Sequence, residues 1–179
     1  MQNFDLSVFI NGSYGNKVYN YLSMKLTHMN SPWTNQLNAV NGRAQLVPIN
    51  PNKVYEDGTM WYNDVSNVMV ANPGASIPRA TINDPNDNDR ISDRYIEDGS
   101  YIRLKNISLG YTFPKKTIDK LGLSNLRIYA NIQNLLTITG YDGYDPEIGA
   151  STSSVNVYGL DNGRYPSPTV YSFGLNVSF

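Results

Sequence analysis

The chain lacks the residue types on which many enzyme and metal sites depend. None of its 179 residues is cysteine, and His28 is the single histidine. Without cysteine the chain cannot form a disulfide scaffold, a thiolate zinc site or a thiol nucleophile. One histidine cannot supply a histidine-rich metal site or a pair of catalytic histidines.

Charge is also scarce. Charged residues make up 16% of the chain, against about 25% in typical soluble domains. The 14 Lys and Arg and the 15 Asp and Glu leave a formal net charge of −1. The chain therefore has neither the basic excess that binds nucleic acid by counterion release nor a polybasic membrane patch.

Long hydrophobic runs are absent too. No run approaches the roughly 18 to 20 apolar residues of a membrane helix, so a helical membrane protein is excluded. A membrane β-protein is not excluded, because its alternating strands escape hydropathy scans. The abundant residues are asparagine (23), tyrosine (14), glycine (14) and proline (10), which indicate strands joined by long, turn-rich loops.

Four segments alternate between apolar and polar side chains with a period of two, which is typical of half-exposed strands. We expect strands at about residues 3–14, 100–113, 125–138 and 169–179. Each segment is long enough for a tilted strand to cross a bilayer. The second segment changes phase at Lys105 and Asn106, which predicts a β-bulge.

The connections between these segments differ greatly in length. Residues 114–124 form a short link, in which Lys115 to Leu121 predict a helical turn that ends at Gly122. The loops at about 15–99 and 139–168 are longer than compact soluble domains usually carry. Outer-membrane barrels have this asymmetry, with short periplasmic turns and long outer loops.

The longer loop has a helical pattern at its start, where apolar side chains recur at Val18, Leu22, Leu26 and Met29. The rest of the loop is rich in proline, asparagine and aspartate. We therefore expect irregular, well-hydrated structure there.

Four strands cannot close a membrane barrel, because the smallest barrels have eight strands and lipid does not tolerate unpaired edges. Residues 1–5 lack the basic and apolar regions of a signal peptide, although a barrel protein must be exported. We therefore expect this chain to be a piece of a larger protein, or to assemble with copies of itself.

Three stretches make the interpretation more specific. They are RYIEDGSYIRLKNISLGYTFP (94–114), LRIYANIQNLLTITGYDGYDPE (126–147) and PSPTVYSFGLNVSF (166–179). In this order they resemble the SusC/RagA family of TonB-dependent outer-membrane transporters. Residues 78–81 resemble one of the family's long loops and residues 4–16 an upstream barrel strand. The resemblance covers nearly the whole chain, and residues 30–75 are the least distinctive.

The resemblance implies an all-β fold, in which the chain supplies the last four strands of a large antiparallel transmembrane β-barrel with long extracellular loops. Such proteins are integral to the outer membrane of Gram-negative bacteria of the Bacteroidota type. They import glycan fragments or peptides. The plug domain of the family has no counterpart in this sequence.

The resemblance also implies partners. These are a SusD-like surface lipoprotein that acts as a lid, TonB through the missing N-terminal region, the barrel-assembly machinery, outer-membrane lipid, and an oligosaccharide or peptide substrate. No catalytic signature surrounds His28, so we expect no enzymatic activity and place His28 on the loop helix. No cofactor or metal is expected.

The last strand resembles the signal that barrel-assembly machinery reads. Its apolar side chains are Tyr171, Phe173, Leu175, Val177 and Phe179. An ordinary amphipathic strand is the alternative. Aromatic residues near the strand ends, among them Tyr14, Tyr101 and Tyr111, suit the interfacial girdles of a barrel or the packing of a soluble sandwich.

The third strand has one polar face, which we expect to line the lumen: Arg127, Tyr129, Asn131 and Gln133. The opposite side chains, such as Ile128, would then face lipid. An arginine facing lipid costs about 2–4 kcal/mol at the midplane, which favours this orientation.

The loop after the third strand carries four candidate ligand contacts: Tyr141, Asp142, Tyr144 and Asp145. Rings stack on sugar faces and carboxylates accept hydrogen bonds from hydroxyls. The alternative is that these residues shape the loop whatever the substrate. Trp33 and Trp61 likewise either pack within their loop or contact the lid.

Asp84, Asn86 and Asn88 match the first ligand positions of a calcium-binding EF-hand loop. The match then fails, because Asp89 occupies the required glycine position and Tyr95 the bidentate glutamate position. A hydrated Asn/Asp turn is the preferred interpretation.

Three other functions are compatible with the residues. A surface binding or adhesion protein would keep these strands without transporting. An outer-membrane enzyme would need a cluster of polar side chains on the loops. A soluble antiparallel sandwich would bury the apolar faces against each other.

Overall fold

The computed structural model describes residues 3–29, 31–84, 86–147 and 158–179. It divides into two compact units. The first unit combines Met1–Tyr19 with Ile96–Phe179, and the second is Asn20–Tyr95. Among the described residues, no helix is long and apolar enough to cross a membrane.

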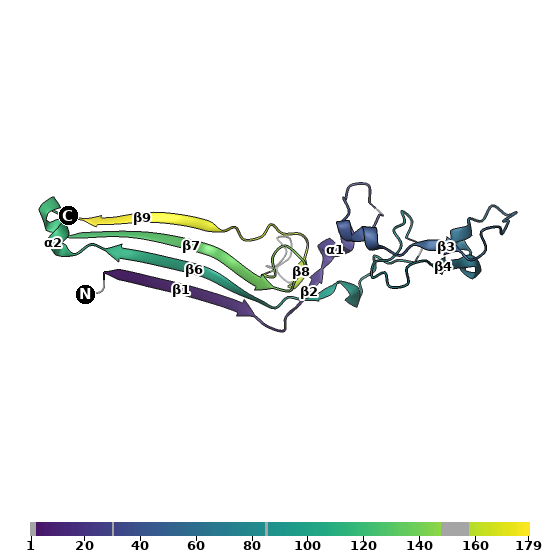
Figure 1. Cartoon of the computed structure of the whole chain (residues 1–179), viewed down its shortest axis with the longest axis horizontal. Coiled ribbons are helices and arrows are strands. Elements are labelled where there is room, and N and C mark those ends of the chain that lie inside the picture. The colour runs from purple at the N-terminus through teal and green to yellow at the C-terminus, as the bar shows by residue number, and fades with distance from the viewer. Residues whose placement is uncertain (1–2, 30, 85, 148–157) are drawn as a thin grey trace. The chain divides into compact units, whose positions relative to one another are not determined.

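The first unit is built on a four-stranded antiparallel sheet (Figure 1). Its strands are β1 (Phe4–Ser13), β6 (Tyr101–Thr112), β7 (Asn125–Thr139) and β9 (Val170–Ser178). The spatial order β1-β6-β7-β9 follows the order of the long strands in the chain. The predicted all-β antiparallel fold is therefore confirmed.

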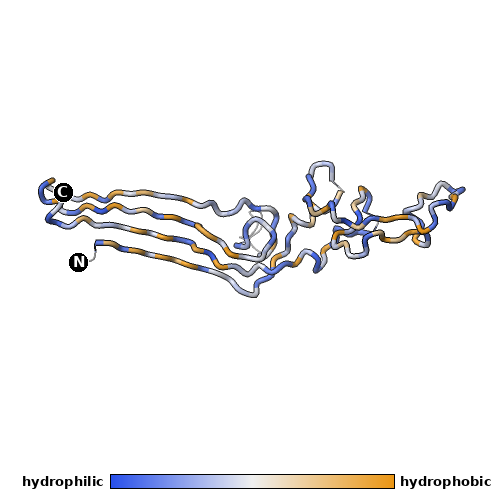
Figure 2. The backbone as a smooth tube through the Cα atoms, in the orientation of Figure 1, coloured by the Kyte–Doolittle hydropathy of each residue, from blue (hydrophilic) through white to orange (hydrophobic). Residues whose placement is uncertain are grey.

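The two faces of this sheet differ in polarity. One cross-strand row is apolar, with Leu6 opposite Leu109, Leu109 opposite Ala130, and Ala130 opposite Phe173. The next row, one residue along, is polar and runs from Ser7 to Ser172. Figure 2 shows the resulting alternation of hydrophilic and hydrophobic positions along each strand. Phe173 is 83% exposed, so the apolar face has no cover within the described structure.

A bulge in β6 keeps the apolar side chains on one face along its whole length. The pairing with β1 skips Lys105, since Asn106 lies opposite Phe9 and Leu104 lies opposite Ile10. The register with β7 shifts at the same place, next to Asn134, whose φ is 51°. This confirms the bulge predicted from the phase change at Lys105 and Asn106.

A short helical link joins β6 to β7. It comprises α2 (Lys115–Ile118) and the 3-10 helix η5 (Asp119–Leu121). Gly122 adopts the left-handed conformation, with a φ of 70°, and ends the link. The predicted helical turn with Gly122 as its stop is confirmed. β1 begins and β9 ends at this end of the sheet (Figure 1).

The two long connections leave the other end of the sheet, where a second, smaller sheet forms. It has the order β5-β2-β8 and consists of β2 (Lys17–Asn20), β5 (Ile96–Asp98) and β8 (Leu160–Asp161). Lys17 Nζ lies 3.2 Å from Asp98 Oδ2. These strands were not predicted, because two to four residues are too few to show an alternation.

The second unit contains one short α-helix, α1 (Tyr21–Leu26). The helix is shorter than the predicted pattern, because Asn20 caps its N-terminus by accepting a hydrogen bond from Ser23 N at 2.8 Å. Val18 belongs instead to β2, and Met29 lies beyond the helix. The prediction of a helix from Val18 to Met29 is therefore corrected.

The remainder of the second unit holds short elements, so it is less irregular than predicted. They are β3 (Leu46–Pro48), β4 (Val68–Val70), and the 3-10 helices η1 (Asn38–Gly42), η2 (Trp61–Asn63), η3 (Val65–Asn67) and η4 (Asp93–Tyr95). β3 and β4 pair antiparallel.

Asp64 organises the chain between β3 and β4. Its carboxylate accepts from Lys53 Nζ at 2.5 Å, from Tyr55 OH at 2.9 Å and from Ser66 Oγ at 2.6 Å. The hydrogen bond from Lys53, followed by those from Ser66 and Tyr55, holds the pKa of Asp64 well below its usual value. This polar centre replaces an apolar core in the hairpin.

Candidate functional site

The site lies at the loop end of the main sheet and begins with a buried arginine next to the bulge. Arg103 is 3% exposed, and its Nε donates to Thr137 Oγ1 at 2.8 Å. The other guanidinium nitrogens reach the loop after β7, where Nη1 donates to Glu147 Oε2 at 2.7 Å and Nη2 to Asp145 Oδ1. Charge-assisted bonds of this kind are among the stronger hydrogen bonds in proteins.

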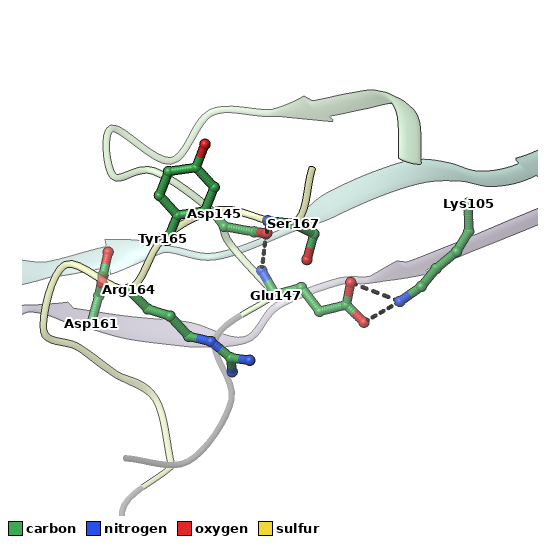
Figure 3. A pocket seen from close by; sticks show the side chains of 7 residues that line it. All are labelled: Lys105, Asp145, Glu147, Asp161, Arg164, Tyr165 and Ser167. Atoms are coloured by element: carbon green, nitrogen blue, oxygen red, sulfur yellow. Dashed lines mark hydrogen bonds and ion pairs between the residues drawn. The ribbon is translucent and has the colours of Figure 1, made fainter. Parts of the chain in front are cut away.

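A second cation shares the same carboxylate. Lys105 Nζ lies 2.6 Å and 2.9 Å from the two carboxylate oxygens of Glu147 (Figure 3). Arg103, Lys105, Asp145 and Glu147 therefore form a charge cluster of two cations and two anions. This balance compensates the burial of Arg103, which unpaired would be strongly destabilising.

Asp145 connects the part of the loop at Glu147 with the part at Ser167. Its Oδ1 accepts from Glu147 N at 2.9 Å, and its Oδ2 accepts from Ser167 N at 3.0 Å. Burial acts to raise the pKa of Asp145, but the hydrogen bonds from Ser167 N and Arg103 outweigh it and hold the pKa below its usual value. The carboxylate is thus ionised at neutral pH and holds the loop ends together.

Tyr141 and Asp161 form a second buried contact in this loop. Tyr141 OH donates to Asp161 Oδ2 at 2.6 Å, and Asp161 Oδ1 accepts from Gly163 N at 2.8 Å. Burial, together with the neighbouring Asp161, raises the pKa of Tyr141. A Cβ atom on Gly143 would lie 2.3 Å from the Tyr141 ring, so only glycine fits beneath it.

These contacts surround a polar hollow of about 260 Å³. Its lining residues are Lys105, Asp145, Glu147, Asp161, Arg164, Tyr165 and Ser167 (Figure 3). Tyr165 is 83% exposed, and Arg164 is also exposed. The hollow therefore offers hydrogen-bonding groups, an exposed cation and an exposed ring to a polar molecule.

The structure assigns different positions to the four predicted loop contacts. Tyr141 and Asp145 are held in the contacts described above, which supports the alternative that they shape the loop. Asp142 and Tyr144 are exposed, and the backbone N of Asp142 donates to Glu97 Oε2 at 3.2 Å. Sequence reasoning missed Arg103, because its partners Asp145 and Glu147 lie 42 and 44 residues further along the chain.

The four residues of the predicted polar face of β7 do lie together on one side of the sheet, opposite the apolar rows. Arg127 forms a two-bond ion pair with Asp5, with Nε 3.1 Å from Oδ1 and Nη2 2.6 Å from Oδ2. The pair spans β6 above Gly110, where a Cβ atom would lie 2.3 Å from Arg127 Nη2.

Tyr129 packs in a similar way on Gly174 of β9. A Cβ atom at Gly174 would lie 2.1 Å from Tyr129 Cζ. The remaining residues of this face, Asn131 and Gln133, lie opposite Ser172 and Val170.

The predicted assembly residues of β9 lie on the apolar face. Tyr171, Phe173, Leu175 and Val177 lie opposite Ile132, Ala130, Ile128 and Leu126 of β7, and Phe179 follows the strand and is exposed. This is the placement that contact with lipid or with assembly machinery requires. Their reading by such machinery stays a prediction.

Two motifs of the longer loop have local structural contacts. His28 does not lie on the helix as predicted, because α1 ends at Leu26; it is buried, and its Nδ1 lies 2.6 Å from Met24 O. Asp84 accepts from Asn88 Nδ2 at 2.8 Å and from Asp89 N at 3.1 Å, which forms the predicted turn. Within the described ranges, no three His, Asp or Glu side chains are grouped as metal ligands.

No protein-family model matches the chain. Curated relatives do. TonB-dependent receptor P3 of Formosa agariphila is 33% identical over 183 residues, which is 99% of this chain and 15% of that receptor. TonB-dependent receptor P26 of the same organism is 31% identical, over 99% of this chain and 16% of its own length. TonB-dependent receptor SusC of Bacteroides thetaiotaomicron is 36% identical over 51% of this chain and 8% of its own.

Solved structures share the fold. The structure of the RagAB peptide transporter superposes with a TM-score of 0.68 at 20% identity, over 99% of this chain and 16% of that one. The RagAB peptide importer in its closed-closed state gives 0.65 over the same shares. The chain thus spans about a sixth of the length of these relatives. The agreement of sequence, fold and two-faced sheet shows that the chain belongs to the SusC/RagA family of TonB-dependent receptors and forms an antiparallel segment of their β-barrel.

Proposed function

We propose that this chain forms part of the barrel wall of a TonB-dependent outer-membrane importer. The observation that carries the proposal is the sheet with one continuous apolar face and one polar face. In a membrane barrel the apolar face contacts lipid and the polar face lines the lumen. If this apolar face were exposed to water instead, its size would make it a site of association with other molecules.

The lengths of the connections support one orientation of the sheet in the membrane. Outer-membrane barrels have short turns on the periplasmic side and long loops outside. The α2–η5 link therefore lies on the periplasmic side. The charge cluster and its hollow then lie on the outer side, where the predicted residues Tyr141, Asp142, Tyr144 and Asp145 also belong.

The unpaired edges of the sheet are explained by the same proposal. Among the described strands, β1 and β9 each have one side without a strand partner. Lipid does not tolerate open edges, so each edge pairs with a further strand of the same barrel. β9 then carries the residues that we assign to recognition by the assembly machinery, Tyr171 to Phe179.

The polar hollow supports a role at the entrance of the importer. The charge cluster holds the loop in place, while Arg164 and Tyr165 are exposed to substrate. Their chemistry suits the hydroxyl groups of a glycan fragment or the amide groups of a peptide. A SusD-like lipoprotein would cover this side, and TonB would supply energy through the rest of the receptor.

Cysteine labelling at two adjacent residues of β7 tests whether the sheet forms part of a barrel wall. Ile132 lies on the apolar face and Gln133 on the polar face, at nearly the same depth. Each is replaced by cysteine in the receptor that contains this chain, on a background without other cysteines. In outer membranes, a lipid-soluble maleimide should label Ile132→Cys, and a water-soluble maleimide should label Gln133→Cys. Equal labelling of both positions by the water-soluble reagent would refute the barrel wall.

A non-transporting surface binding protein remains the second candidate, since the same exposed loops would serve it. Uptake separates the two functions. Cells with the intact receptor should accumulate a labelled glycan fragment or peptide in the periplasm, and cells lacking TonB should not. Binding at the cell surface without accumulation in either strain would favour the binding protein.

A further inference from the structure

The apolar face of the main sheet has a groove of about 420 Å³. Ala130 lies at its centre, between Leu109 of β6 and Phe173 of β9. The methyl group of Ala130 is much smaller than these two neighbours, so the face is hollowed where the row is otherwise filled. The lining side chains of this face are all apolar or aromatic: Phe4, Leu109, Tyr111, Ile128, Ala130 and Phe173.

The other three lining residues are Gly110, Tyr129 and Gly174, which form the row between the two apolar rows. Successive side chains of a strand point to opposite faces, so this row contributes backbone to the groove. The Tyr129 ring covers Gly174 on the polar face. Among the lining side chains of the apolar face, only Tyr111 carries a polar atom. The groove therefore suits a hydrocarbon, because a sugar or a peptide would lose the hydration of its polar groups there.

The position of the groove along β6 gives its depth in the membrane. Leu109 precedes Lys115 by six residues, which is about 20 Å along an extended strand. Barrel strands are tilted by about 35–45°, so this is about 15 Å across the bilayer. Half of the hydrocarbon core is also about 15 Å thick. With Lys115 at the membrane surface, the groove lies in the hydrocarbon layer of the leaflet next to the α2–η5 link.

An aromatic cluster separates the groove from the link. The ring centroids of Phe4 and Tyr111 are 4.6 Å apart, and those of Tyr111 and Phe113 are 4.9 Å apart. Aromatic rings of this kind mark the boundary between hydrocarbon and headgroups. The groove thus opens directly inward of the headgroup layer, where an acyl chain begins.

The link itself is basic. Residues 115–121 contain three exposed lysines and one exposed aspartate, a net charge of +2: Lys115, Lys116, Asp119 and Lys120. Lysines at a membrane surface attract the phosphate groups of lipids. A phospholipid combines the two chemistries that meet here, since its phosphate suits the lysines and its chain suits the groove.

We infer that a phospholipid of the periplasmic leaflet seats one acyl chain in this groove and places its phosphate at Lys115 and Lys116. The inference rests on the proposed function, in which the apolar face contacts lipid and the link lies on the periplasmic side. It assigns one bound lipid to one site, whereas the rest of the apolar face contacts the bilayer without selecting a molecule.

Photocrosslinking tests whether lipid is enriched in the groove. The receptor that contains this chain is reconstituted in vesicles of phosphatidylethanolamine and phosphatidylglycerol. A trace of the phosphatidylethanolamine carries a diazirine in one acyl chain. Mass spectrometry of peptides after illumination locates the attached lipid. Labelling around Leu109, Ala130 and Phe173 should exceed that around Leu104 and Leu136 at least about threefold.

The comparison positions are matched for face and depth. Leu104 and Leu136 lie opposite each other on the same apolar face. Leu104 is three residues from Ile107, near the middle of β6, and Leu109 is two residues from it on the other side. Lipid that contacts the wall without selection would label both pairs alike.

Variants that fill the groove connect the enrichment to its shape. Ala130→Phe and the smaller change Ala130→Leu should each abolish the excess labelling of β6 and β9 at the groove. Leu136→Phe adds a ring to the same face outside the groove and should leave the excess unchanged. Heat-modifiable migration confirms that each variant is an assembled barrel. Lys115→Gln combined with Lys116→Gln should lower the excess without changing the labelling at Leu104 and Leu136.

The outcomes separate the inference from the proposed function. If neither end of the sheet is labelled, the apolar face does not contact lipid, and the proposed wall and the inference both fail. Equal labelling at both ends, or an excess that persists in Ala130→Phe and Ala130→Leu, would keep the wall and overturn the bound lipid. Labelling that is missing from the groove alone would mean that protein covers it, which also overturns the inference. An excess that the double lysine variant leaves unchanged would overturn the phosphate contact.

Discussion

Two glycines decide how large side chains cross the polar face of the sheet. Gly110 lies beneath the ion pair of Arg127 with Asp5, and Gly174 lies beneath the ring of Tyr129. Aromatic rings that cover a strand glycine are a known device that pins the register of neighbouring strands. The absence of a side chain at Gly110 and Gly174 therefore makes room for Arg127 and Tyr129 on the polar face.

Gly174→Ala should destabilise the barrel by about 1–3 kcal/mol, because its Cβ atom overlaps the Tyr129 ring. Urea unfolding of the receptor in lipid vesicles measures the loss. Gly140→Ala is the control, since a Cβ atom there meets nothing within 4 Å. The loss should shrink when Tyr129→Ala is added, and an unchanged loss would contradict the packing.

Arg103 is the residue on which the loop after β7 depends. Arg103→Met removes the group that joins Asp145, Glu147 and Thr137. Because it leaves carboxylates without their cation, we expect a local destabilisation of about 3 kcal/mol. Hydrogen exchange of residues 141–147 should accelerate accordingly.

Arg164→Met serves as the matched control for this experiment. Arg164 lines the same hollow, but it is exposed, and the described residues contain no ion pair with it. Its replacement should leave hydrogen exchange in residues 141–147 unchanged. Equal acceleration in both variants would mean that the charge cluster does not hold the loop.

Acid should loosen the same loop. The pKa of Asp145 is below its usual value, so its contribution to stability is present above the unfolded-state pKa of about 3.9. The contribution is lost as the pH falls through the lower, folded-state pKa. Hydrogen exchange corrected for its intrinsic pH dependence should be constant from pH 7 to 5 and accelerate below about pH 4.

Asp145→Asn supplies the control for the acid effect. Asparagine does not titrate, so the variant should show a loop that is already looser at pH 7 and little further change in acid. An acid transition of unchanged size in Asp145→Asn would assign the effect to another group.

Among the elements, the strand with the bulge shows what alternation can and cannot reveal. The phase change at Lys105 and Asn106 is local in sequence, so the bulge was predictable. The charge cluster was not, because Arg103 and Glu147 are 44 residues apart and no local pattern relates them. β2, β5 and β8 were missed for a different reason, since each depends on its neighbours and not on its own sequence.

The direction of β7 gives a prediction at this scale. Ile128→Arg places a charge on the apolar face and should lower the amount of assembled barrel. Because Ile128 is the fourth residue of β7, the cost should lie between the about 0–1 kcal/mol of an interface and the about 2–4 kcal/mol of the midplane. Asn131→Arg, on the polar face, should be tolerated. Heat-modifiable migration of the receptor in outer-membrane fractions measures assembly, and equal amounts of both variants would reverse our assignment of the faces.

Considered as a whole, the chain combines a sheet whose fold is readable from its sequence with loops whose contacts are not. Period-two alternation predicted the long strands and their two faces because each strand carries its own pattern. The length of the helix after Val18 was overestimated, because the spacing of apolar residues does not show that Asn20 caps the helix. His28 was placed on this helix, but it lies beyond Leu26, and its contact with Met24 O and its burial depend on the folded loop.

The size and location of the native polypeptide test the central claim most directly. An antibody to residues 138–165 is applied to membrane and soluble fractions of the source organism. We predict a heat-modifiable band in the outer membrane, several-fold heavier than the 20.0 kDa of this chain. A band of 20.0 kDa in the soluble fraction would contradict a barrel segment of a TonB-dependent importer.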